Sequence, residues 1–185
     1  TALVSMAVGY LVVELFKETS KWLFLYPLFK KDETKMPTTQ MLLWQNEIIS
    51  PEYHNEIAAK VKETFGRKLP TRKEEEAEPG VSKMRIAEIV SQIRQNCRGD
   101  EILRQYNIEF GFCRNNLGAS VWSILFIINI GVANILYGWL PWWTIVVALV
   151  LQVLLMAGSY MLLETRGLAY AKYLFATFTG KNKKE

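Results

Sequence analysis

Four of the polar side chains within the apolar stretches of this sequence are its first candidates for chemistry. Asn129, Asn134 and Gln152 lie in a run, 115–163, that contains no Asp, Glu, Lys, Arg or His. Glu14 interrupts a shorter apolar segment near the start. Hydrocarbon offers no hydrogen-bond partner, so each of these groups needs a partner within the protein or in enclosed water. They would therefore either hold helices together or line a pore, and both interpretations favour a homo-oligomer.

The densest local cluster of aromatic and polar residues spans 106–120, where Gly111 and Gly118 provide two flexible points. One interpretation is a membrane-entry elbow, in which Arg114 reaches lipid phosphates and the asparagines cap helix ends. Another is a gating collar through which a cytoplasmic domain pulls on the membrane helices. The elbow and gating candidates are Tyr106, Asn107, Glu109, Arg114, Asn115 and Asn116.

Several catalytic and cofactor chemistries have no motif in this chain. The sequence lacks a P-loop and the GxGxxG, GxSxG and HExxH patterns. It contains one histidine, His54, and two cysteines, Cys97 and Cys113, without a CxxC pair. We therefore expect no cofactor, no metal site and no enzymatic activity. We also expect two free thiols and a histidine on the protein surface.

Arg114 and Asn115 resemble the start of the Arg-Asn/His-x4-His motif of HEPN ribonucleases, and Ser120 stands where that motif has its final histidine. The resemblance implies a degenerate HEPN-like helical domain and, as the enzymatic alternative, a ribonuclease that depends on Arg114. The chain is also similar in size and plan to small CRISPR accessory proteins that form pores. The same plan resembles other small bacterial membrane effectors of antiphage systems, and this similarity implies a role in antiviral defence.

The long uncharged run predicts a transmembrane helical hairpin over 119–163. Its two apolar stretches, 120–140 and 144–163, are each long enough to span about 30 Å of hydrocarbon at about 1.5 Å per residue. Pro141 breaks the helix between them, and the neighbouring tryptophans suit the membrane interface.

The first segment, 1–29, predicts an N-terminal membrane or interfacial helix. Glu14 and Lys17 are three residues apart, as are Glu18 and Lys21, and this spacing predicts ion pairs along one helix. A second interpretation places Glu14 in a water-filled lumen between subunits.

Between these membrane segments, 30–118 predicts a small helical cytoplasmic domain, and 164–185 predicts a basic cytoplasmic tail. The domain has 15 Lys and Arg against 14 Asp and Glu, and this balance gives no strong indication of nucleic-acid binding. Helix caps and a capping box are indicated at Ser50, Pro51, Gly66, Thr71 and Glu74.

The sequence thus predicts an all-α integral membrane protein of the bacterial inner membrane. Lys and Arg flank the hairpin but are absent from its turn, which places the central domain and the C-terminus in the cytoplasm. The leading hypothesis is a homo-oligomeric effector or accessory protein that forms or gates a pore, or perturbs the bilayer, under control of its cytoplasmic domain. The alternative is a membrane-anchored adaptor that recruits a cytosolic protein partner. The expected partners are therefore the lipid bilayer, further copies of the chain and a cytosolic protein.

Overall fold

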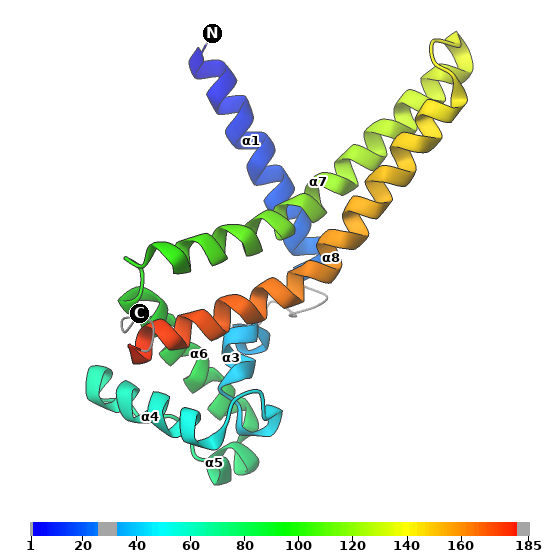
Figure 1. Ribbon diagram of the computed structural model, residues 1–185. Helices are drawn as coiled ribbons and strands as arrows, with labels where there is room; N and C mark the ends of the chain where they lie inside the picture. The colour runs from blue at the N-terminus through cyan, green and yellow to red at the C-terminus, as the bar shows by residue number, and fades with distance from the viewer. Residues whose placement is uncertain (1, 26–32, 181–185) are drawn as a thin grey trace. The chain divides into compact units, whose positions relative to one another are not determined.

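The computed structural model describes residues 2–25 and 33–180, which are helical almost throughout and contain no strand (Figure 1). The all-α class is confirmed for this part of the chain. The expected domain boundary between residues 29 and 30 lies outside the described residues. The long helices α7 (Glu101–Tyr137) and α8 (Trp142–Thr179) are apolar enough to cross a membrane.

The chain divides into two compact units. We call Thr1–Leu28 with Gly111–Leu163 the hairpin unit, and Phe29–Phe110 with Glu164–Glu185 the globular unit. The helices α7 and α8 each contribute residues to both units.

The hairpin unit consists of α1 (Ala2–Ser20), the π-helical turn η1 (Lys21–Leu25) and the apolar parts of α7 and α8. The apolar parts of α7 and α8 run side by side, and α1 approaches them only at its C-terminal end (Figure 1). The most apolar windows of α7 and α8 are only 17% and 6% buried, whereas a core helix of a water-soluble protein is mostly buried.

The structure differs from the sequence prediction at the expected elbow. No break separates a cytoplasmic helix from a membrane helix, because α7 is continuous over 37 residues. Gly111 and Gly118 lie inside this helix. A glycine costs a helix only about 1 kcal/mol relative to alanine, which the surrounding backbone hydrogen bonds and packing outweigh.

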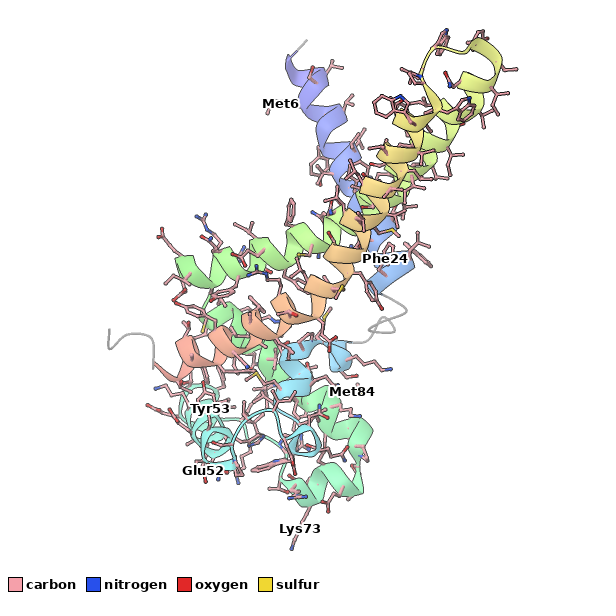
Figure 2. The ribbon with its side chains drawn as sticks, turned by 45° about the vertical axis from the view of Figure 1, so that its right-hand side comes forward. Met6, Phe24, Glu52, Tyr53, Lys73 and Met84 are labelled. Carbon is pink, nitrogen blue, oxygen red and sulfur yellow. The ribbon has the colours of Figure 1, made fainter. Side chains whose placement is uncertain are left out.

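The globular unit is built from short helices around one apolar core. Its elements before α7 are η2 (Glu33–Lys35), α3 (Pro37–Met41), η3 (Trp44–Asn46), α4 (Pro51–Phe65), α5 (Arg72–Ala77) and α6 (Pro79–Asn96). The fully buried core residues include Leu42, Ile57, Ile86, Ile89, Ile93, Leu174 and Phe175. Met84, on α6, points away from this core and is 63% exposed (Figure 2).

The predicted helix caps of this unit are confirmed. The Ser50 hydroxyl accepts a hydrogen bond from the Tyr53 backbone N–H, and α4 ends at Gly66 with a φ of 67°. Thr71 and Glu74 form both hydrogen bonds of a capping box at the start of α5. These local signals set the helix boundaries because they satisfy backbone groups that the helix itself leaves unpaired.

The segment expected as a basic tail is instead the second half of α8 as far as Thr179. Ala171, Leu174 and Phe175 are completely buried in the core of the globular unit, and Phe178 is nearly so. The stretch is helical because its apolar residues recur at the spacing of one helix face, which the core covers. The basic residues that suggested a tail, Lys181, Lys183 and Lys184, lie outside the described residues.

His54 is buried rather than exposed, with only 3% of its surface accessible. Its Nε2 donates a hydrogen bond to the Leu42 carbonyl over 2.9 Å, and its ring centroid lies 3.8 Å from that of Trp44. The buried carboxylate of Glu75 accepts hydrogen bonds from the backbone N–H groups of Trp44 and Gln45. His54 is therefore part of the core packing, because it begins the apolar stripe of α4.

Candidate functional site

The hairpin unit holds most of the polar residues that the sequence singled out, and two hydrogen bonds join its antiparallel helices. Gln152 Nε2, on α8, donates to the hydroxyl of Ser120 on α7 over 2.9 Å. Asn116 Nδ2, on α7, donates to the hydroxyl of Ser159 on α8 over 2.6 Å. Ser120 and Ser159 are both buried. These pairs satisfy polar groups between the helices of one chain.

Asn134 closes the turn of the hairpin. Its Nδ2 donates to the Leu140 carbonyl over 2.8 Å, and its Oδ1 accepts from the Leu140 N–H over 2.7 Å. The side chain is only 3% exposed. Gly138 has a φ of 64°, which residues other than glycine rarely adopt. It lets the chain reverse direction between Asn134 and Leu140. The structure therefore places Asn134 in the last turn of α7, with both ends of its amide bonded to one residue of the loop that follows.

Asn129 differs from these residues because its side chain is exposed. Its Nδ2 donates to the Leu125 carbonyl of the same helix over 2.8 Å, and it makes no described hydrogen bond to another helix. It lies in a groove of about 590 Å³ between α1 and α7. The other groove residues are mostly apolar: Phe16, Trp122, Ser123, Leu125, Phe126 and Ile127.

The helices α1 and α7 cross in backbone contact at Gly118. A Cβ atom added there would lie 1.8 Å from the Phe16 carbonyl oxygen and 3.0 Å from the Ser20 nitrogen. The Trp122 indole N–H donates to the Thr19 hydroxyl over 2.9 Å beside this crossing. Sequence reasoning treated Gly118 as a flexible point, but its role is to permit the close approach of two helices.

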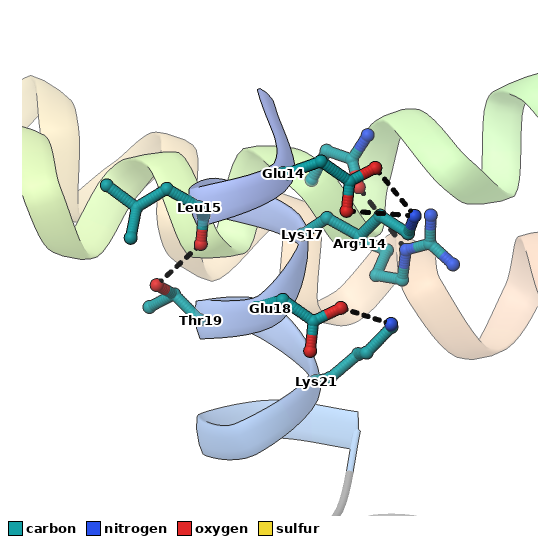
Figure 3. Close-up of polar contacts among 8 residues, drawn as sticks. Glu14, Leu15, Lys17, Glu18, Thr19, Lys21 and Arg114 are labelled. Atoms are coloured by element: carbon teal, nitrogen blue, oxygen red, sulfur yellow. Dashed lines mark hydrogen bonds and ion pairs between the residues drawn. The ribbon is translucent and has the colours of Figure 1, made fainter. Parts of the chain in front are cut away.

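Charged side chains lie at the same end of α1 (Figure 3). Lys17 Nζ pairs with Glu14 over 2.9 Å, and Lys21 pairs with Glu18, which confirms both predicted ion pairs. Arg114, on α7, points toward this cluster, and its Nε donates to the Asn115 Oδ1 over 3.3 Å. Glu14 is therefore partnered along its own helix in the single chain.

The remaining elbow candidates belong to the globular unit. The Tyr106 ring lies 5.1 Å from that of Tyr173, and Glu109 accepts a hydrogen bond from Arg166 over 2.7 Å. Both contacts join α7 to α8. Asn107 lines a small cavity of about 240 Å³.

The position that corresponds to the final histidine of the HEPN motif lies between the two hairpin helices. Ser120, at the position of the missing histidine, is fully buried and accepts the Gln152 hydrogen bond. Within residues 2–25 and 33–180, no group of three or more His, Cys, Asp or Glu side chains could hold a metal ion. Cys97 and Cys113 are both buried, and neither forms a disulfide with another described residue.

Comparison with known proteins gives no relative for the chain: no protein family, curated protein or solved structure matches it. The geometry described above is therefore the basis for the functional proposals that follow.

Proposed function

We propose that this protein is a homo-oligomeric membrane protein whose helices α1, α7 and α8 form or gate a polar path, or perturb the bilayer. We place it in the bacterial inner membrane with the globular unit in the cytoplasm. The globular unit controls the state of the membrane helices in this proposal.

The exposed apolar surface of the hairpin unit supports membrane insertion. Every residue of α1 from Val4 to Val13 is exposed, and Met6 stands clear of the other helices at 72% (Figure 2). Leu136 and Met161, on α7 and α8, are each 75% exposed. Exposing apolar area to water costs about 25 cal/mol per Å², whereas lipid removes that cost.

Asn129 carries the proposal of self-assembly. Among the polar residues that the sequence singled out in the hairpin, it is the one whose side chain lies on an exposed, apolar face. An amide in hydrocarbon is stabilised when it bonds across a helix interface, typically by about 0.6 to 2 kcal/mol. A second copy of the chain seated on the Asn129 groove would supply that interface, and α1 offers a second unpacked apolar surface for the same contact.

The mass of the full chain in nanodiscs, with lipid and scaffold subtracted, tests this proposal. Four or more copies would allow the helices to surround a lumen, and ion conductance in planar bilayers is then expected. Asn129→Leu keeps the side-chain size but removes the amide, so we expect fewer copies and reduced conductance. Asn129→Gln retains an amide and serves as the matched control. A monomer or dimer that passes no ions would contradict the proposal.

A second candidate function is a membrane-anchored adaptor that recruits a cytosolic protein. It is favoured by the polar contacts of Gln152, Asn116 and Asn134, which are all made within one chain, so the hairpin needs no lumen to satisfy them. An adaptor predicts that Asn129→Leu leaves cellular activity unchanged. It also predicts normal activity when surface residues of the hairpin are exchanged for other apolar ones.

A further inference from the structure

The globular unit contains a small cavity rich in arginine, and the proposed function does not use it. The cavity has a volume of about 240 Å³ and lies where α6 ends and α7 begins, against α8. Its polar lining residues are Arg94 on α6, Arg98 and Asp100 between α6 and α7, Arg104 and Asn107 on α7, and Tyr170 on α8.

The charge of this lining is strongly positive although the chain as a whole is nearly balanced. The lining contains three arginines and one acidic residue, Asp100. The Asp100 Oδ1 accepts a hydrogen bond from the Leu103 N–H and so caps α7. Among the described residues, Arg94, Arg98 and Arg104 form no ion pair with a carboxylate. Like charges that converge without a counter-charge destabilise a fold, and a bound anion would remove that repulsion.

Arg94 gives an independent indication that an acceptor belongs in this region. Its Nη2 donates to the Thr38 hydroxyl over 2.6 Å, which fixes the guanidinium in place. Its Nε is buried and has no hydrogen-bond acceptor among residues 2–25 and 33–180. A buried donor without a partner is rare in folded proteins, and it is typically satisfied by a ligand, an ion or a water molecule.

We propose that this cavity binds a phosphate group. Guanidinium groups match phosphate oxygens because their planar N–H donors form paired, charge-assisted hydrogen bonds. The Asn107 amide and the Tyr170 hydroxyl add neutral donors on the side formed by α7 and α8. The volume is below the roughly 300 to 1,000 Å³ of sites for drug-sized molecules, and it suits a phosphate with little attached to it.

This site is independent of whether the hairpin unit forms a path or only an anchor, since its lining residues all belong to the globular unit. The phosphate could belong to a soluble phosphomonoester or to a lipid headgroup. Both sources present the same chemistry to the arginines.

Thermal unfolding and calorimetric titration of the full chain in nanodiscs test the proposal. In discs of phosphatidylcholine alone, inorganic phosphate and glycerol phosphate are titrated against chloride at equal ionic strength. Discs that contain phosphatidic acid form the second arm. Saturable stabilisation by the soluble ligands points to a soluble source. Stabilisation only in phosphatidic acid discs points to a headgroup.

Arg98→Gln/Arg104→Gln removes two of the three charges, and both residues are exposed enough for the chain to fold without them. We expect phosphate affinity to fall at least about tenfold. Arg67→Gln/Arg85→Gln removes the same charge from exposed positions elsewhere in the unit and should leave the affinity unchanged. Phosphate also stabilises proteins non-specifically, so a response that is unsaturable or equal in both double variants would overturn the proposal. No response in either arm would overturn it as well.

Discussion

The crossing of α1 and α7 gives the sharpest single test of the fold. In Gly118→Ala, the new Cβ would lie 1.8 Å from the Phe16 carbonyl oxygen, and ordinary contact begins at 3.4 Å. The helices must therefore separate locally by about 1.6 Å, since neither backbone can yield as a flexible side chain would. Separation also strains the hydrogen bond from Trp122 to Thr19.

The expected loss of stability follows from two opposing effects. Alanine in place of glycine stabilises a helix by about 1 kcal/mol, and overpacking of a tight contact typically costs about 1 to 3 kcal/mol. A clash with backbone belongs at the upper end of that range, about 3 kcal/mol. Subtracting the helix gain of about 1 kcal/mol, we expect Gly118→Ala to lower the free energy of unfolding by about 2 kcal/mol.

Unfolding in mixed detergent micelles, followed by circular dichroism, measures this change. Gly111→Ala is the matched control, because it lies on the same helix and a Cβ there would meet nothing within 4 Å. The control should be as stable as the natural chain or slightly more so. Faster trypsin cleavage at Lys17 in Gly118→Ala alone would locate the damage at α1. Equal stability of the two variants would refute the close crossing.

Three further predictions concern the turn and the globular unit. Asn134→Leu removes both hydrogen bonds to Leu140, and we expect a loss of about 1 to 3 kcal/mol in the same micelle unfolding assay. Glu75→Ala leaves two buried backbone N–H groups of the 44–45 turn unpaired, so amide hydrogen exchange there should accelerate at least about tenfold. Burial lowers the pKa of His54, against smaller opposing effects of the Leu42 carbonyl and Glu75. The unfolded chain therefore binds a proton more readily than the folded one, and the unfolding free energy should fall as the pH drops below about 6.5. His54→Gln should weaken this pH dependence of the unfolding free energy. If the unfolding free energy of the variant varied with pH as it does in the natural chain, the assignment to His54 would be contradicted.

Local signals made much of the fold predictable from the sequence. The caps at Ser50, Gly66 and Thr71 act within one turn of the chain, and the ion pairs of Glu14 and Glu18 lie within one helix. Such contacts depend on spacing alone, so they can be recognised without knowledge of the fold.

Tertiary contacts account for what the sequence analysis missed. The core face of α8 follows the spacing of Ala171, Leu174, Phe175 and Phe178, but the nearby lysines directed attention to a tail. His54 lies one turn before Ile57 on the same buried stripe, a signal that a helical projection would have revealed.

The candidate site shows the same division between local and tertiary information. The sequence identified Gln152 as a polar group in an apolar environment and Asn116 as an elbow candidate. It did not identify their partners Ser120 and Ser159, which lie 32 and 43 residues away. The arginines of the cavity are similarly dispersed, since Arg104 reaches it from a different helix than Arg94.

The buried end of α8 has a consequence for the order in which the protein is made. Leu174 and Phe175 fill the core of the globular unit, yet they are synthesised after the whole apolar hairpin. The helices α3 to α6 are synthesised earlier, but they lack these core side chains until the ribosome has passed the hairpin. The apolar hairpin is therefore complete while the core of the globular unit is still open. A chain truncated within the last turns of α8 would accordingly keep its apolar hairpin but lack a finished globular unit.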